Sequence, residues 1–533
     1  LSLHDALPIF FSVPFLFQLF LHSTGVTMAV KNVLIEIQRK AAFEASLFGS
    51  GLIGQKALET ASSMAGSIPG FTLDQQFSPI PAPPSSAAAA PFTMDPSDAS
   101  YETVLLRGTI DEDIASPESL ALGANAGQYA VYADPFIEPY ITCGDSPPIG
   151  TAADVGRLLG RSELHRAGME GQGVLLAIVD TGINLAHLQG LGLNPRLDAS
   201  MSWVPPLQPG QSPMVPGQMP PGHGTMCAFD ALIAAPAATL LDIAILASRR
   251  PGGSPMEGLL SDAVLGYSHL LRVLRNLTRP GGFRSLVISN SWGMFRQSWD
   301  FPKGHPGNYS HNPDHPFNRI VATLERAGAD ILFAAGNCGK ECPDGRCGNE
   351  TSAGIYGANS HPSVISVAGT DIRKERVGYS TRGPGKLSAR KPDIACYTHF
   401  SGSQIYPADG GTSAATPVAA GLVAAIRSRY PSSPERSPAL MRKMIRSTAE
   451  DAGRSGFDHE TGHGIVRGPE LAQAWAKHKS KTPPSSPPDQ PPDQGSIPMD
   501  QDSNITDADF MDALRAFPLP GSTPAATTAC CPG

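Results

Sequence analysis

The sequence predicts an α/β protein: a large domain with a largely parallel sheet flanked by helices, preceded by a small unit of element order βαββαβ. Two observations lead to this prediction. Short runs that are apolar on both faces alternate with helix-forming stretches between residues 154 and 478, and another alternation of strand- and helix-forming stretches occupies residues 28–140. The 533 residues, 41% of them hydrophobic, are enough to bury at least one large core.

Charge and cysteine content exclude several classes of protein. The formal net charge is −8, and the chain has no basic stripe of the kind that binds phosphates, so we expect no nucleic-acid partner. Eight cysteines in a chain of this length are too few for a disulfide scaffold. They leave the cellular compartment open.

Residues 1–27 form a hydrophobic segment with two interpretations. It is either a secretory leader, although no basic residue precedes the apolar run, or translated adaptor sequence, in which case Met28 is the true start. The run is short for a membrane-spanning helix, so we expect no stable membrane anchor. The localisation is left open: secreted if the leader is real, and cytoplasmic otherwise.

The small unit, residues 28–140, is predicted from the order of its helix- and strand-forming stretches. Helix-forming stretches stand at 38–66 and 116–127, and strand-forming stretches at 33–37, 71–80, 103–110 and 128–137. This βαββαβ order is that of a ferredoxin-like domain.

The large domain, residues 154–478, is predicted from five apolar runs. They are VLLAIVD (174–180), LLDIAILA (240–247), SLVISNSWG (285–293), DILFAAGN (330–337) and SVISVAG (363–369). Runs apolar on both faces are typical of parallel strands covered by helices. Residues 141–153 are expected to be a linker and processing region, and the Pro-rich stretch 479–533 a disordered tail because it cannot bury a core.

Four polar residues stand where strands end or helices begin. Asp180 ends the run 174–180, His223 lies in GHGT, Asn337 ends the run 330–337, and Ser413 lies in GGTSAATPVAAG. Each alone has a structural interpretation, as a helix cap, a surface histidine or a turn former. In an open α/β sheet, however, the carboxyl ends of the strands form the usual active-site crevice.

Together these residue types suit acyl transfer. A serine hydroxyl becomes a good nucleophile when a histidine takes its proton, the histidine needs an acid to fix its tautomer, and the oxyanion needs hydrogen-bond donors. The chain order Asp, His, Ser is one of three unrelated orders known for such a triad.

The motifs AIVDTGI (177–183), GHGT (222–225), AAGN (334–337) and GTSAATPVAAG (411–421) resemble those of subtilisin-type serine peptidases, the subtilases. The resemblance implies a subtilisin-like fold, with Asp180 as orienting acid, His223 as general base, Ser413 as nucleophile and Asn337 as oxyanion donor. It implies no cofactor for the chemistry. Structural calcium is common in the family, but no compact acidic loop marks a site here.

Part of the nucleophile region resembles the kexin-like branch of the family. Ala414 and Val418 near the nucleophile, Cys227 after GHGT and SWG at 291–293 carry this likeness. Because no second β-domain is expected after the large domain, a preference for basic residues is not carried over.

The resemblance also gives residues 28–140 a role. Subtilase propeptides share the βαββαβ order, so this unit is expected to be a self-cleaved propeptide and intramolecular inhibitor, with an unrelated small domain as the alternative. The segment ADPFIEPYITC (133–143) is expected to lie in the active-site cleft. Subtilase substrates pair with strands near SWG, so Ser291, Trp292 and Gly293 are predicted substrate contacts.

Two loops have competing interpretations. CGKECPDGRC (338–347) is expected to hold a disulfide beside Asn337, with Cys396 or Cys143 as other partners and free thiols as the next alternative. A zinc site is not favoured, because it would need a fourth ligand. A later-inserted loop carries His305, His311 and His315, and we interpret it as polar and solvated rather than metal-binding. No metal site is predicted.

The sequence thus predicts a serine endopeptidase acting on proteins or peptides. Ser413 is expected at the amino terminus of a helix, with Pro417 tolerated in the first turn. Two alternatives remain: a catalytically silent protein that binds peptides, and a peptide ligase or cyclase that passes the acyl group to an amine.

Overall fold

The computed structural model describes only part of the chain. The described residues are 30–38, 65–82 without 67 and 78, 103–116, 119, 129–140, and 147–478 without 207–211, 248–255, 278–281 and 352–353. The hydrophobic segment 1–27, the tail 479–533 and residues 141–146 of the linker 141–153 therefore lie outside the described residues.

The main domain is built on a parallel sheet of seven strands, which confirms the predicted α/β class. Their order across the sheet is β15 (Ile394–Tyr397), β14 (Ile365–Thr370), β13 (Asp330–Ala334), β11 (Ser285–Asn290), β7 (Val174–Val179), β9 (Thr239–Ile243) and β8 (Arg196–Leu197). All five predicted apolar runs contribute a strand. Strands β15 and β8 were not predicted.

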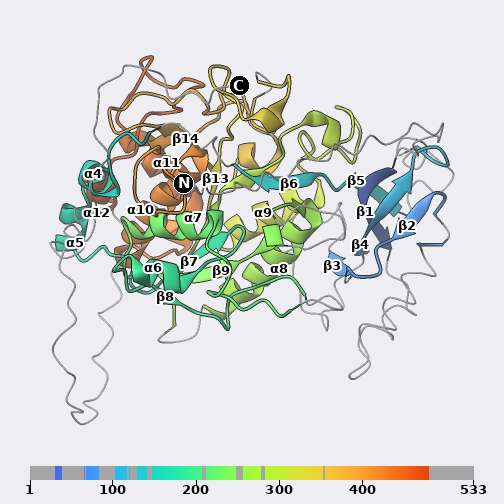
Figure 1. Ribbon diagram of the computed structural model, residues 1–533, viewed down its shortest axis with the longest axis horizontal. Coiled ribbons are helices and arrows are strands. Elements are labelled where there is room, and N and C mark those ends of the chain that lie inside the picture. Colours follow the sequence, from blue (N-terminus) through green and yellow to red (C-terminus); the bar gives the residue numbers. More distant parts are fainter. Residues whose placement is uncertain are drawn as a thin grey trace, which may run out of the picture.

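Helices cover both faces of this sheet (Figure 1). They are α4 (Ala152–Leu158), α5 (Arg161–Arg166), α6 (Leu185–Gly190), α7 (His223–Leu232), α8 (Leu260–Asn276), α9 (Pro316–Arg326), α10 (Gly411–Arg429), α11 (Pro438–Thr448) and α12 (Gly468–Lys477). Alternate residues of β7 enter different cores: Leu176 packs in the cluster with α7 and α10, and Leu175 in the cluster with α8 and α9. This two-sided burial explains why the strands read as continuous apolar runs.

The amino-terminal part forms a separate antiparallel sheet. Its strands are β2 (Phe71–Leu73), β4 (Thr103–Asp111), β1 (Val30–Gln38) and β5 (Tyr129–Ala133) in spatial order, with β3 (Ile80–Ala82) paired to β4. The predicted strand 71–80 therefore forms β2 at its first three residues, and β3 begins at its last residue. The predicted helices 38–66 and 116–127 lie almost wholly outside the described residues, so the propeptide identity stays a prediction.

One side of this sheet is joined to α8 and α9 by ion pairs. Arg107 Nη1 lies 2.8 Å from Asp262 Oδ1 in the first turn of α8, and Arg319 Nη2 of α9 lies 3.1 Å from Glu36 Oε1. Asp134 Oδ1 accepts a hydrogen bond from the Ser261 N–H at 2.8 Å. These groups are largely buried, so the contact is specific and not a loose surface encounter.

Strand β6 (Phe136–Pro139) leaves the amino-terminal sheet and enters the main domain (Figure 1). It becomes the middle strand of a small antiparallel sheet, between β10 (Gly258–Leu259) and β12 (Trp292–Gly293). An extended segment has thus been added between two strands of the main domain.

Helix α10 corrects one prediction. The helix begins at Gly411, so Pro417 is its seventh residue and lies beyond the first turn. A proline there removes the N–H that would bond the Ser413 carbonyl four residues earlier. That carbonyl instead accepts from Ser291 Oγ at 2.9 Å and from the Cys227 thiol at 3.6 Å. Other side chains therefore compensate for the missing helical bond.

Among the residues that the structure describes, no helix combines the length and apolar character needed to cross a lipid bilayer.

Candidate active site

Asp180 and His223 form the first half of the site. Asp180 directly follows β7, and His223 is the first residue of α7. His223 Nδ1 lies 2.8 Å from Asp180 Oδ1 and 3.0 Å from Oδ2, and both side chains are almost completely buried. The carboxylate is therefore placed to hold the proton on Nδ1, which leaves Nε2 as the basic nitrogen.

The Cys227 thiol lies one helical turn after His223 and packs against the same pair. Its Sγ is 3.7 Å from Asp180 Oδ2 and 3.8 Å from His223 Nδ1. Burial, and then the charge of Asp180, raise the pKa of the thiol well above its usual value. The group is thus a neutral thiol that donates weakly, not a reactive thiolate.

Ser413 is the third residue of α10 and is fully buried. Its Oγ donates to the Ser291 carbonyl at 3.0 Å, while His223 Nε2 has no hydrogen-bond partner within the described chain. The Cys227 thiol contacts both the His223 ring and the Ser413 carbonyl, so one sulfur atom touches both residues. The structure brings Asp180, His223 and Ser413 together, with the serine hydroxyl turned toward Ser291.

Asn337 follows β13 and has a fixed amide orientation. Its Oδ1 accepts from the Thr412 N–H at 2.9 Å and from Thr412 Oγ1 at 3.0 Å. Because a backbone N–H can only donate, the amide nitrogen must point the other way. Nδ2 donates to the Tyr140 carbonyl oxygen at 2.9 Å. The predicted oxyanion donor thus bonds a peptide carbonyl from the end of β6.

Gly411 makes room for that carbonyl. Its φ is +75°, a conformation that side chains rarely adopt, and a Cβ there would lie 2.5 Å from the Tyr140 oxygen. The glycine before the nucleophile therefore permits both the turn and the close approach of the carbonyl.

The three predicted substrate contacts all meet β6, in different ways. Tyr140 N–H donates to the Ser291 carbonyl at 3.1 Å, and Trp292 and Gly293 pair with Pro139 and Glu138. The Trp292 side chain, however, is fully buried in the core against Phe317 and Phe333. Its indole is therefore a core group, and only its backbone faces the bound segment.

The Tyr140 side chain fills a pocket that the sequence did not reveal. Its ring lies 5.0 Å from the Phe295 ring, in a buried cluster with Ala334, Cys338 and Cys347. At Gly293 a Cβ would lie 2.0 Å from the Tyr140 hydroxyl. The lining comes from separate segments, and no local pattern marks them as one pocket.

A disulfide joins Cys338 and Cys347, which confirms a crosslink beside Asn337 and gives its partner as Cys347 instead of Cys396 or Cys143. Cys396 is a buried thiol. Among the described residues, the single cluster with the makings of a metal site is Asp180, His223 and Cys227. These are side chains of the candidate catalytic centre, so the observation does not support a separate metal site.

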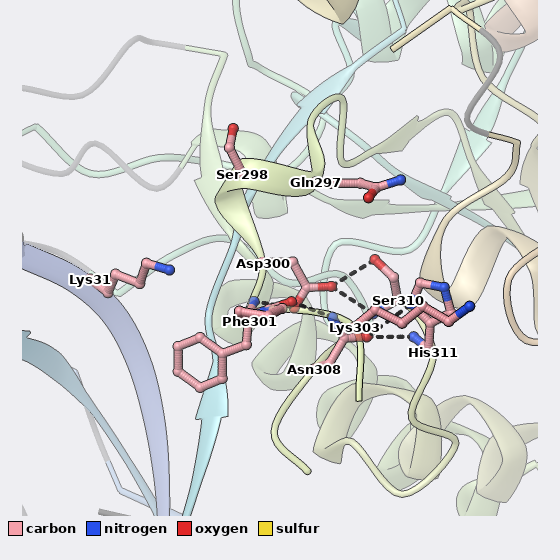
Figure 2. A pocket seen from close by; sticks show the side chains of 10 residues that line it. Lys31, Gln297, Ser298, Asp300, Phe301, Lys303, Asn308, Ser310 and His311 are labelled. Carbon is pink, nitrogen blue, oxygen red and sulfur yellow. Dashed lines mark hydrogen bonds between the residues drawn. The ribbon is translucent and has the colours of Figure 1, made fainter. Parts of the chain in front are cut away.

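The prediction of a polar, solvated histidine loop holds only in part, because His305 and His311 are half-buried and His315 lies in the interior. His315 is fully buried and its Nε2 lies 2.8 Å from the Ala133 carbonyl of β5. Asp300 organises the loop by accepting from the N–H groups of Phe301 and Ser310 and from Ser310 Oγ (Figure 2). It also accepts from the Tyr309 N–H. A hollow of about 420 Å³ beside it opens toward Lys31 and contains none of the candidate catalytic residues.

Comparisons with known proteins agree with this geometry. The model of the subtilase family matches residues 171–464. Subtilisin amylosacchariticus from Bacillus subtilis subsp. amylosacchariticus is 28% identical over 318 residues, which cover 58% of this chain and 68% of that protein. Subtilisin E from Bacillus subtilis is 27% identical over 321 residues, with the same coverage of both proteins.

A solved structure is also similar: fervidolysin from Fervidobacterium pennivorans, described as a keratinolytic enzyme related to subtilisin. The TM-score is 0.48 at 17% identity, and the match covers 84% of this chain and 61% of that one.

Proposed function

Because the chain belongs to the subtilase family of serine peptidases, we propose that it is an endopeptidase that hydrolyses peptide bonds with Ser413 as nucleophile. One observation carries the proposal. Asn337 Nδ2 holds the Tyr140 carbonyl while β6 pairs antiparallel with β12, which is the way a peptide substrate would be held.

The chemistry follows from the residues around that carbonyl. Ser413 Oγ turns from the Ser291 carbonyl to His223 Nε2, gives up its proton and attacks the carbonyl carbon. Asp180 stabilises the resulting imidazolium through Nδ1, and Asn337 stabilises the oxyanion. His223 then protonates the leaving amine, and a water molecule, activated in the same way, releases the acid from the acyl-enzyme.

Processing of the chain itself belongs to this proposal. Tyr140 would be the last residue of a propeptide, and the bond cleaved would be Tyr140–Ile141. Residue 141 and its neighbours up to 146 lie outside the described residues, but Tyr140 already has the contacts of a residue just before a cleaved bond. The ion pairs of the amino-terminal sheet with α8 and α9 support its retention as an intramolecular inhibitor.

The location of the enzyme is also a proposal. Disulfides persist mainly in oxidising compartments, so the Cys338–Cys347 bond favours an enzyme exported from the cytoplasm. Alkylation of thiols in protein taken directly from its source, followed by mass analysis, tests this. Labelling of both cysteines there would contradict it.

The test is intact mass over time for protein begun at Met28, with Ser413→Ala as the matched control, followed by fluorophosphonate labelling. We expect wild type alone to release a fragment ending at Tyr140 and to take the label on Ser413. If folded wild type stays whole and refuses the label, the silent peptide-binding alternative is favoured. Addition of an amine separates a ligase from a hydrolase, because hydrolysis adds the mass of water to the product.

A further inference from the structure

Glu138 is the third residue counted back from the proposed cleaved bond, and its side chain has a specific partner. Glu138 Oε2 lies 2.8 Å from Arg346 Nη1, and the two side chains are 18% and 30% exposed. The β6 backbone bonds are available to any sequence, so they cannot distinguish substrates. Side-chain contacts such as this one provide the discrimination.

Arg346 is also held by two groups of the main domain, Asp344 and Phe295. Asp344 binds it through two parallel contacts, from Nε at 3.0 Å and from Nη2 at 2.8 Å. Its guanidinium carbon lies 4.1 Å from the centre of the Phe295 ring. A planar guanidinium fixed by one carboxylate and one aromatic face loses little further side-chain entropy on binding a second carboxylate.

The loop that carries Arg346 is itself constrained. Arg346 precedes Cys347, whose disulfide with Cys338 closes the loop, and the Asp344 N–H donates to the Asn337 carbonyl at 2.9 Å. The cation is therefore tied to the oxyanion donor through a short, crosslinked stretch of backbone. Its position relative to the Tyr140 carbonyl is set by the fold and not by the bound segment.

We propose that Arg346 is a specificity-determining residue that selects an acidic side chain at the third position before the cleaved bond. This inference rests on the proposed function, in which the bond after Tyr140 is cut. The substrate class is then a peptide with the pattern acidic, any residue, aromatic, where the aromatic ring enters the pocket beside Phe295. A lysine at the third position would place an ammonium beside Nη1 of Arg346.

The first test is charge exchange in the full chain, with the rate of release of the fragment ending at Tyr140 as readout. Glu138→Lys and Arg346→Glu should each slow release by roughly 5- to 20-fold, as for a partly exposed charge-assisted pair. The double variant should recover most of the rate. Glu112→Lys is the matched control, because it changes the charge by the same amount at a residue that pairs with Lys31 and not with Arg346. This variant should leave the rate unaltered. A double variant as slow as the slower single would overturn the inference.

The second test avoids folding defects because the enzyme is not altered. Self-processed wild type is given the peptide Phe-Ile-Glu-Pro-Tyr-Ile, followed by the same sequence with glutamine or lysine in place of glutamate. We expect kcat/KM to fall in the order Glu, Gln, Lys, and the differences to narrow at high salt. Equal values of kcat/KM for all three peptides would refute the role of Arg346 in specificity and leave the proposed function standing. Failure to process and to cleave any peptide would instead refute the proposed function, and the inference with it.

Discussion

Asn337 and Tyr140 are joined by a hydrogen bond of 2.9 Å from the amide nitrogen to the carbonyl oxygen. The donor assigned to the oxyanion thus already holds the carbonyl group of the segment that precedes the main domain. Since Asn337 Oδ1 is engaged by Thr412, the amide has one orientation, which is the one that the proposed mechanism needs.

Replacing Asn337 by aspartate should remove this donor and keep the acceptor for the Thr412 N–H. We expect kcat to fall by about 100- to 1,000-fold, the usual cost of losing one oxyanion donor. Steady-state kinetics on a peptide substrate measures this, with Ser413→Ala as the floor and thermal unfolding as the check that the fold is intact. A loss below tenfold would mean that Asn337 does not stabilise the transition state.

Gly293→Ala should change the preference for the residue before the cleaved bond. A Cβ would meet the Tyr140 hydroxyl at 2.0 Å and its ring carbon at 2.7 Å, so a tyrosine could no longer enter fully. We expect at least about a tenfold fall in kcat/KM for tyrosine substrates, the cost of an overpacked site, and a smaller one for alanine substrates. The ratio of the two values is the measurement, and an unchanged ratio would place the tyrosine elsewhere.

Ser291→Ala should destabilise the fold through the Ser413 carbonyl. That carbonyl lacks a helical N–H because of Pro417, and it would keep only the weak Cys227 donor. An underbonded buried carbonyl costs about 1–3 kcal/mol, which thermal or urea unfolding can detect. Ser289→Ala is the matched control, since the Ser289 hydroxyl is buried two residues earlier, in β11, without a partner among the described residues. Equal losses for the two variants would contradict the assignment.

Docking of the amino-terminal sheet should weaken as the pH rises. Burial, opposed by the charge of Arg107, raises the pKa of Asp134 from 3.8 to about 6. A carboxyl whose pKa is raised in the docked state binds its proton more tightly there than in the undocked state. Its stabilisation of docking is therefore full below pH 3.8 and is lost as the pH rises through about 6. Burial favours the protonated form, whereas the hydrogen bonds from Ser261 at the start of α8 oppose it by favouring the carboxylate.

Thermal unfolding of the uncleaved Ser413→Ala chain between pH 4 and 7 tests this. Adding Asp134→Asn should flatten that part of the pH profile, because asparagine is neutral throughout. Asp113→Asn, at an exposed position, is the control. If Asp134→Asn leaves the profile unchanged, Asp134 does not govern docking.

Most strands of the sheet, and the grouping of four candidate catalytic residues, could be predicted from the sequence. These residues are Asp180, His223, Ser413 and Asn337. Strands buried on both faces read as apolar runs, and each of the four residues stands in a short motif at the end of a strand or the start of a helix. Local chemistry and local structure coincide there, so one stretch of sequence shows both.

The errors have physical causes. Pro417 was placed in a first turn because Ser413 was taken as the start of the helix, whereas α10 begins two residues earlier. The polar composition of the histidine loop does not reveal its buried part, residues 307–310, where Asp300 accepts from the N–H groups of Tyr309 and Ser310. Arg346 meets Glu138 across 208 residues of chain, and no local pattern encodes such a contact.

Helix α10 has a consequence for the order of events during synthesis. It packs against α7 and against five strands of the sheet, and its residues from Gly411 to Ser428 are all buried. The core therefore cannot close until the ribosome has passed this helix. At roughly 5–20 residues per second, β1 to β6 are available well before translation reaches α10. The segment that occupies the cleft is synthesised earlier than the serine proposed to cleave it. The cleft of the nascent protein can therefore be occupied as soon as it forms.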